Sequence, residues 1–413
     1  MKAIRIGLCL VVTFAVAAHG AVEPWSEFGV QVAAAVLLLL WVALCLRRGT
    51  VELRWNPLFL PLLVLGAIAL TQYFGGGTAY PYLTKVALLK WSAYGVIFFL
   101  AVQAVRTAEE ARGMIWYLMV LGFAVALFGI VQHLTFNGKL YWFRELRYGG
   151  IVFGPYVNRN HFSGLMELLL PLGMAILFVR GVRRDQLPLV GLFTLVPVGA
   201  LFLAASRGGI VSFVAQTALL AGLLFTLPGG RRRMATVLGF VLLASGLLVW
   251  LEADAFLRRF TELAEEIPYD RRLSMAQDAW RIFREHTWTG TGLGTFGTVH
   301  PRYESFYDGK LAVHAHNDYL ELLAEMGIVG GAALLGFLVL LFRLALGRLA
   351  HERLAFALAA RLGAVSGCAG LLVHSLVDFN LQLPSHAILF LLLTAIATSD
   401  GPAAAGDVWS NFR

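Results

Sequence analysis

The chain has 413 residues, of which 59% are hydrophobic and 14% are charged, and its mean hydropathy is +0.73. Soluble globular proteins carry about 25% charged residues, so this composition excludes a soluble multidomain enzyme, and the high hydrophobicity excludes a disordered chain. The net charge of +8 is therefore interpreted through the orientation of membrane segments, and no nucleic-acid partner is expected. Cys9, Cys45 and Cys368 all lie in apolar runs, which indicates neither a disulfide framework nor a metal knuckle.

The apolar residues are gathered into runs of about 17–25 residues, the length that an α-helix needs to cross a bilayer core. This pattern predicts an all-α polytopic membrane protein with about twelve transmembrane helices. The first run follows Lys2 and Arg5 as a signal peptide would, but we interpret it as a span. The expected helices are 4–21, 28–46, 57–73, 83–105, 113–134, 161–180, 187–205, 209–226, 234–251, 319–343, 355–377 and 384–399.

Basic residues predict the orientation of these helices. With both termini in the cytoplasm, more than half of the 33 lysines and arginines fall in cytoplasmic segments, as the positive-inside rule requires. The short outer loops 20–27, 74–82 and 378–383 contain no lysine or arginine. The predicted organisation is transmembrane helices 1–9 in residues 1–251, a periplasmic loop with amphipathic helices in 252–318, and transmembrane helices 10–12 with a short cytoplasmic tail in 319–413.

Ionisable residues inside the expected spans lie mainly in their outer halves. Such residues are costly in a bilayer and are functional candidates, although some long side chains near helix ends reach the headgroups instead. The asymmetry indicates a cavity that opens to the outer face. These residues are Lys85, Lys90, His133, His161, Glu167, Glu321, Glu325, His374 and His386, with Asp318 and Asp378 at outer helix ends.

The long loop is predicted to contain a helix that Asp270 caps and that runs to about residue 285. Arg281 and Arg284 are expected to contact lipid phosphates, whereas Arg272 borders the apolar stripe and is a candidate to point inward. Helical spacing predicts an apolar face made of Leu273, Ala276, Ala279, Trp280 and Phe283.

A glycine-rich segment, TGTGLGTFG at 289–297, follows that helix. It superficially fits a nucleotide-binding loop, but no strand precedes it and no suitable helix follows. We therefore interpret it as a tight turn that brings the loop back over the membrane.

The loop ends in HAHNDYLE at 314–321, where Asp318 and Glu321 have the spacing of a capping box and predict the start of a helix. His316 would then precede a helix N-terminus, where a neutral imidazole is favoured and can serve as a general base. Two other interpretations stay open. In the first, His316 has only a structural role at the start of a helix. In the second, His314 and His316 bind a metal together with His300 or Asp318.

Four stretches in order along the chain resemble one known family. The run HNDYLELLAEMG, from His316 to Gly327, resembles the signature of the O-antigen ligase and polymerase superfamily. The segments NRNHFSG at 158–164 and ASRGG at 205–209, and Arg272 followed by GTGLG at 290–294, resemble its other motifs. The resemblance covers about residues 150 to 345 and the overall topology. It implies an all-helical membrane glycosyltransferase fold of the C type.

The resemblance implies a lipid A–core O-antigen ligase of the bacterial inner membrane. Such an enzyme transfers polysaccharide from undecaprenyl diphosphate to a hydroxyl of lipid A–core oligosaccharide on the periplasmic face. A metal-independent, inverting transfer without a cofactor is expected, because the donor brings its own leaving group and the outer loops contain no DxD pair. The partners are the lipid-linked polysaccharide, the lipid A–core acceptor and membrane lipid.

The chemistry assigns roles to residues of the motifs. Arginines donate bidentate, permanently charged hydrogen bonds to a diphosphate, and a neutral histidine accepts the proton of the acceptor hydroxyl. His316 and Arg207 are the predicted catalytic residues, and Arg207, Arg272 and Arg159 are predicted to bind the donor diphosphate. The predicted supporting residues are His314, Asn317, Asp318, Glu321, Asn160 and Lys90.

Other functions remain open at this point. An O-antigen or exopolysaccharide polymerase uses the same donor with a growing glycan as acceptor, and a protein O-oligosaccharyltransferase uses a protein hydroxyl. A transporter or flippase of lipid-linked sugars belongs to a different class. Alternating access calls for polar residues through both halves of the membrane, and the inner half here contains almost none.

Overall fold

The computed structural model describes the chain except for residues 147–149, 262–270, 307–308, 310 and 401–413, and it describes only the backbone of residues 251–261. The expected cap Asp270 and most of the expected cytoplasmic tail lie outside the described residues. The helices are α1 (Lys2–Ala17), α2 (Pro24–Arg48), α3 (Phe59–Phe74), α4 (Pro81–Ala104), α5 (Arg112–Leu134), α6 (Arg159–Val179), η1 (Arg184–Gln186), α7 (Leu187–Leu203), α8 (Arg207–Thr226), α9 (Gly230–Thr261), α11 (Arg271–Glu285), α12 (Phe296–Val299), η3 (His300–Arg302), α13 (Asp318–His351), α14 (Ala355–His374), η4 (Asn380–Gln382) and α15 (Pro384–Thr398).

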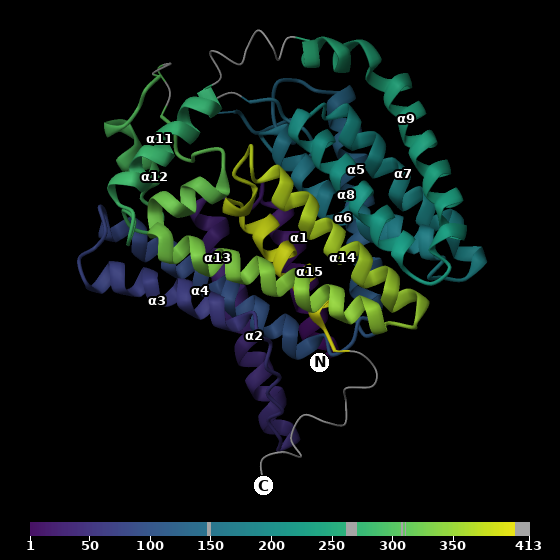
Figure 1. Cartoon of the computed structure of the whole chain (residues 1–413), viewed down its shortest axis with the longest axis horizontal. Coiled ribbons are helices and arrows are strands. Elements are labelled where there is room, and N and C mark those ends of the chain that lie inside the picture. Colours follow the sequence, from purple (N-terminus) through teal and green to yellow (C-terminus); the bar gives the residue numbers. More distant parts are fainter. Residues whose placement is uncertain (147–149, 262–270, 307–308, 310, 401–413) are drawn as a thin grey trace.

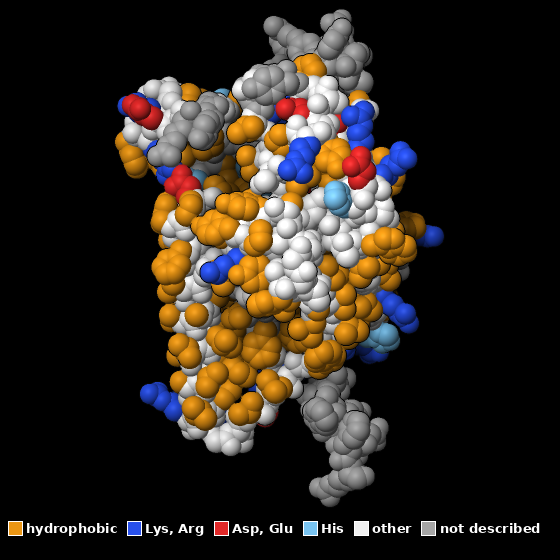
Figure 2. Space-filling model, turned by 90° about the vertical axis from the view of Figure 1, so that its left-hand side faces the viewer, with side chains coloured by type: hydrophobic (Ala, Val, Ile, Leu, Met, Phe, Trp, Pro, Cys, Tyr) orange, Lys and Arg blue, Asp and Glu red, His pale blue; other side chains and the backbone are white. Residues whose placement is uncertain are grey.

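The fold is an all-α polytopic membrane protein, as predicted, and each of the twelve expected ranges contains a helix. Among the described residues, nine helices have the length and composition of a membrane span. The helices α1, α3 and α15 have 16, 16 and 15 residues and are shorter than a typical span. Figure 2 shows hydrophobic side chains over most of the middle of one face, with charged side chains mainly above and below them.

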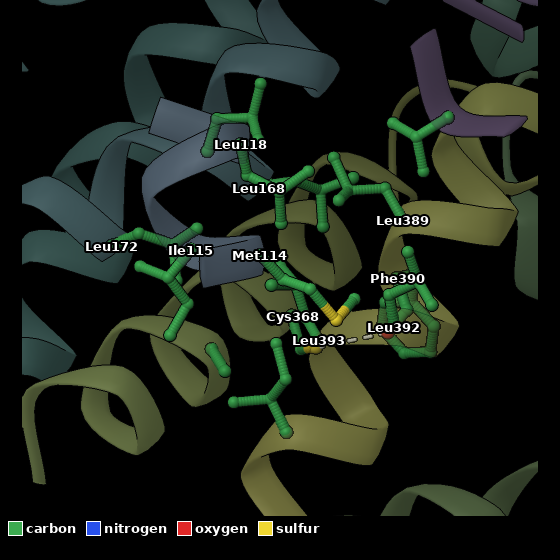
Figure 3. Packing of buried hydrophobic residues seen from close by; sticks show 14 of the residues in the cluster. Met114, Ile115, Leu118, Leu168, Leu172, Cys368, Leu389, Phe390, Leu392 and Leu393 are labelled. Carbon is green, nitrogen blue, oxygen red and sulfur yellow. Dashed lines mark hydrogen bonds between the residues drawn. The ribbon is translucent and has the colours of Figure 1, made fainter. Parts of the chain in front are cut away.

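The centre of the bundle is formed by α6 and α14 (Figure 1), which are the most completely buried of the candidate spans. Two glycines of α14 allow the close approach. A Cβ at Gly363 would lie 2.8 Å from Leu172 Cα, and a Cβ at Gly367 would lie 2.9 Å from the Leu168 carbonyl oxygen. Small residues at such contacts let membrane helices pack backbone to backbone. Figure 3 shows the surrounding core, where Leu168 and Cys368 lie with residues of α15.

The loops form two groups at opposite ends of the bundle, and the loops within each group contact one another. At one end, which we call the site face, Ser385 N donates to Gly20 O, Ala79 N to Thr291 O, and Asp318 N to Ser375 O. These loops are the ones expected in the periplasm. At the opposite face, Asp400 accepts from Arg54 and Arg348, and Arg5 pairs with Glu110, in segments expected in the cytoplasm.

The glycine-rich segment is a turn, and it is seated in a kink of α13. Gly290, Gly292 and Gly294 have positive φ, and the Glu325 carboxylate accepts hydrogen bonds from the amides of Gly294 (2.9 Å) and Phe296 (2.8 Å). Gln72 on α3 completes the contact, donating to Thr289 O and Glu325 O and accepting from Leu293 N. Glu325 therefore anchors the loop to α13, which accounts for a carboxylate inside this span.

Gly327 is the residue of α13 that admits this turn. Its φ of 64° and ψ of −166° lie in a region that is essentially restricted to glycine, and a Cβ there would lie 2.4 Å from the Trp288 carbonyl oxygen. We expect Gly327→Ala to destabilise the protein by about 1–3 kcal/mol or more. The measurement is the thermal unfolding temperature of the purified protein in detergent.

Gly336→Ala is the matched control, because Gly336 lies in the same helix and a Cβ there meets nothing within 4 Å. Its unfolding temperature should equal that of the unmodified protein or exceed it, since alanine favours helix. Equal stability of the two variants would show that the loop is not seated in this kink.

Candidate functional site

The carboxylate of Asp378, in the loop after α14, is the centre of a hydrogen-bonded cluster at the site face. Its side chain is 0% exposed, and it accepts from His316 Nδ1 (3.0 Å), Asn160 Nδ2 (2.8 Å) and its neighbour Phe379 N (2.9 Å). Arg272 Nη2 lies 3.5 Å away. Burial alone raises the pKa of Asp378, but the hydrogen bond from His316 and the positive charge of Arg272 lower it well below its usual range. A buried, ionised carboxylate therefore joins three separate parts of the chain.

His316 is held in one orientation by this carboxylate. An ionised carboxylate only accepts hydrogen bonds, so Nδ1 carries a proton, and in the neutral ring Nε2 has the free lone pair. The backbone of His316 has a φ of 50°, in the left-handed region that non-glycine residues seldom adopt. Its side chain is 23% exposed and lines a cavity of about 400 Å³. The arrangement can accept a proton at Nε2 from a group bound in the cavity.

The start of α13 differs from the expected capping box. The N-cap is Asn317, whose side chain accepts from Leu320 N (2.9 Å), and Asp318 is the first helical residue. Glu321 does not reach back to Asp318 but accepts from Ala315 N and from His314 Nδ1, both at 2.7 Å. The prediction named the correct helix start with the wrong cap. The reason is that Asn is as good a cap as Asp, and spacing alone does not choose between neighbours.

His314 is paired with Glu321 and differs from His316 in its electrostatics. Burial lowers the pKa of His314, but the Glu321 carboxylate raises it by more, so the pKa lies above its ordinary value. A raised pKa favours the protonated ring, which suits a cationic role better than that of a general base.

The aromatic ring of Phe379 separates three histidines. Its centroid lies 4.5 Å from the ring of His314, 4.7 Å from that of His316 and 4.9 Å from that of His161. The residues proposed for a metal site fall into separate pairs, since His300 lies 3.3 Å from Asp278 and the other two histidines contact Glu321 and Asp378. Among the described residues no group of three or more candidate ligands is found.

The predicted arginines start helices that converge on the site face. Arg159 and Arg207 are the first residues of α6 and α8, whose N-caps are Asn158 and Ser206. Ser206 Oγ also donates to Asn160 Oδ1 (2.9 Å), which connects the start of α8 to the Asp378 cluster. Helix N-termini present free amides and a partial positive charge, so with arginine side chains they can bind an anion such as a diphosphate.

Arg272 lies at the start of α11 and contacts the loop that carries Asp378. In addition to its contact with Asp378, its Nη1 donates to Val377 O (3.2 Å). The cavity beside it has both cationic and apolar walls, lined by Arg271, Arg272, Met275, Leu311, Ala312, Val313, His314, His316 and Phe379. Its size and mixed polarity suit a sugar next to a charged group.

The buried face of α11 agrees with the predicted one at Ala279 and Phe283 and differs from it elsewhere. Met275, Asp278, Ala279, Ile282 and Phe283 are buried, whereas Leu273 and Trp280 are exposed. The helix packs against α13, and Asp278 is buried because it bonds Ser305 N and lies near His300. Composition did not reveal that an acidic residue would be internal.

The structure brings most of the predicted site residues together. His316, Asn160 and Arg272 meet at Asp378, and Asn317 and Asp318 fasten α13 to the loop after α14 through Leu376 O and Leu381 N. Lys90 forms an ion pair with Glu27 on α2 (3.6 Å), and its positive charge also acts on His314, whose pKa it lowers. Sequence reasoning placed Asp378 only at an outer helix end. The available signal was an acidic residue at the start of an outer loop that has no basic residue.

One comparison with known proteins matches the chain. Residues 192–335 match the family model described as O-Antigen ligase, which confirms the resemblance to the O-antigen ligase superfamily. The matched segment contains Arg207, Arg272 and His316, whereas Asn160 and Asp378 lie outside it. No curated protein matches the chain.

Proposed function

We propose that this membrane protein is an O-antigen ligase that transfers polysaccharide from undecaprenyl diphosphate to a hydroxyl of lipid A–core oligosaccharide. The reaction takes place at the periplasmic face of the bacterial inner membrane. The observation that carries the proposal is a cavity lined by His316 and Arg272, both of which contact the buried Asp378. It lies in a chain whose residues 192–335 match the O-antigen ligase family model. The site therefore combines a general base, His316, with an anion-binding group, Arg272.

In the proposed reaction, His316 Nε2 accepts the proton of the acceptor hydroxyl as its oxygen attacks the anomeric carbon of the donor sugar. The bond between that carbon and the diphosphate oxygen breaks, and the diphosphate leaves with the electron pair. Asp378 stabilises the imidazolium that forms, as the carboxylate of a catalytic triad does. Arg207, Arg272 and Arg159 stabilise the negative charge on the leaving group. A single displacement of this kind inverts the anomeric configuration.

A deletion strain tests the function directly. If the protein is a ligase, the polysaccharide ladder on lipopolysaccharide disappears and polymer accumulates on the lipid carrier. If lipopolysaccharide with a single repeat persists instead, the protein is a polymerase. A normal ladder with loss of glycan from proteins would assign it to protein O-glycosylation, and accumulation of carrier-linked units in the cytoplasmic leaflet would assign it to transport.

The proposed orientation predicts opposite labelling of two engineered cysteines. Ser305→Cys lies at the site face and Thr50→Cys follows α2 at the opposite face, and both positions are exposed. Cys9, Cys45 and Cys368 are buried and should give little background. A membrane-impermeant maleimide applied to cells with a permeabilised outer membrane should label only the cysteine at 305. Labelling of the cysteine at position 50 alone would show that the protein has the opposite orientation in the membrane.

Transfer is expected to need no divalent metal, because arginines neutralise the leaving diphosphate in this proposal. Purified protein assayed with lipid-linked donor and acceptor in excess EDTA should retain its rate. A rate that EDTA abolishes and added magnesium or zinc restores would contradict this assignment and favour metal binding by the histidines.

A further inference from the structure

We propose that Glu167 and His374 form a buried positioning pair that fixes the first turn of α8, and with it Arg207, relative to Asp378. The inference rests on the proposed function and names two further residues that it requires. Neither residue belongs to the predicted site, although both are ionisable residues in the outer halves of expected spans.

The pair is completely buried between the helices that carry the site. Glu167 on α6 is 0% exposed and His374 at the end of α14 is 1% exposed, and His374 Nδ1 lies 2.9 Å from Glu167 Oε1. Glu167 Oε2 and His374 Nε2 have no hydrogen-bond partner within the described part of the chain. Buried ionisable groups are costly, and side chains of similar volume without charge often pack equally well or better. Packing alone therefore does not explain this pair.

His374 contacts both turns on which the proposed chemistry depends. Its carbonyl oxygen accepts from Val377 N (2.9 Å) and Asp378 N (3.0 Å), so it supports the turn that presents the central carboxylate. Its imidazole faces Gly208 at the start of α8, where a Cβ would lie 2.7 Å from Nε2. Gly208 follows Arg207 directly, so the imidazole packs against the turn that carries this arginine.

Glu167 adds the third helix. It lies two turns along α6 from Asn160, which donates to Asp378, and it fixes the orientation of the imidazole through Nδ1. One hydrogen bond thus connects α6 and α14 at the level where α8 begins. A displacement of about 1 Å at such a position can cost roughly 100-fold in rate.

The test replaces the pair by apolar residues of similar size, Glu167→Met with His374→Leu. The expected result is an unchanged or higher unfolding temperature with a kcat for transfer that is about 10- to 100-fold lower. The KM for the acceptor should not change. Glu167→Gln should restore most of the turnover in the presence of His374, because its amide oxygen accepts the same hydrogen bond.

Gln216→Met is the matched control. Gln216 lies on α8 against Gly370 of α14, is equally buried and has both amide atoms without a partner among the described residues, but it is two turns farther from Arg207. This variant should transfer at the unmodified rate. A second check is Gly208→Ala, which should lower turnover because its Cβ would lie 2.7 Å from His374 Nε2 and would displace the imidazole from the start of α8.

Donor binding gives a readout that does not depend on transfer. Undecaprenyl diphosphate should raise the unfolding temperature of the unmodified protein, and this increase should shrink in the double variant. If the unmodified protein binds the carrier but transfers no glycan to any acceptor, the proposed function fails and the positioning pair is still tested by this shift. Wild-type turnover and an unchanged shift in the double variant would overturn the inference, as would a loss of activity that only follows a loss of folded protein.

Discussion

Replacing His316 with alanine is expected to lower glycan transfer by about 10²–10⁴-fold, the usual contribution of a general base. The protein should still fold, because the loop before α13 is also held by Glu321, which accepts from Ala315 N and contacts His314. The measurement is the initial rate of transfer from lipid-linked donor to acceptor by purified variant, beside its unfolding temperature. Donor binding, measured as the thermal shift with undecaprenyl diphosphate, should survive.

His314→Ala is the matched control, since His314 lies two residues away and touches the same Phe379 ring. Its loss should cost clearly less, because its Nδ1 is paired with the Glu321 carboxylate, which raises its pKa and favours the protonated ring. If His314→Ala were inactive and His316→Ala active, the two assignments would be exchanged. The lowered pKa of Asp378 keeps its carboxylate ionised, so its stabilising contacts should be lost only as the pH falls through that lowered value.

Arg207→Ala is expected to lower transfer roughly 10- to 100-fold, because a charge-assisted hydrogen bond contributes about 1.5–3 kcal/mol. Arg207→Lys should recover little of this loss, since an ammonium group lacks the two-pronged geometry of a guanidinium. The measurements are transfer rate and the thermal shift produced by undecaprenyl diphosphate, and both should fall.

Arg302→Ala provides the control for charge alone, because Arg302 is exposed near the site face but lies outside the cavity lining and the Asp378 cluster. It should transfer at the unmodified rate. Turnover by Arg207→Ala equal to that of Arg302→Ala, at equal expression, would remove Arg207 from the donor site.

The membrane helices could be predicted from the sequence because their signal is local. Each predicted apolar run contains a helix, nine helices among the described residues have the length and composition of a span, and helical spacing located α11. The buried side of α11 was predicted only in part: Ala279 and Phe283 are buried, but Leu273 and Trp280 are exposed. Asp278 is internal through partners such as Ser305, which folding brings alongside. The cap of α13 was wrong by one residue because Asn317 and Asp318 have similar capping strength.

The site could be predicted only in part. His316 and Arg272 were recognised from motifs, and they do lie together, but the residue that joins them was missed. Asp378 is 62 residues from His316 along the chain, and no local sequence pattern predicts their contact. The same limit applies to Glu325, whose interpretation as part of an open cavity changed once its bonds to the glycine-rich turn were known.

Because the glycine-rich turn is bound to α13, the residues of the site belong to two groups of helices. One half is tied to α13 and α3, because Glu325 and Gln72 hold the glycine-rich turn of the loop that later reaches His316. The other half belongs to the buried pair α6 and α14, which carries Asn160 and the turn of Asp378. The hydrogen bond between His316 and Asp378 crosses the seam between them. Asn317 and Asp318 cross the same boundary through Leu376 O and Leu381 N. A shift of α13 against α14 would therefore have to break several hydrogen bonds together, so the base is held in register with the turn that orients it.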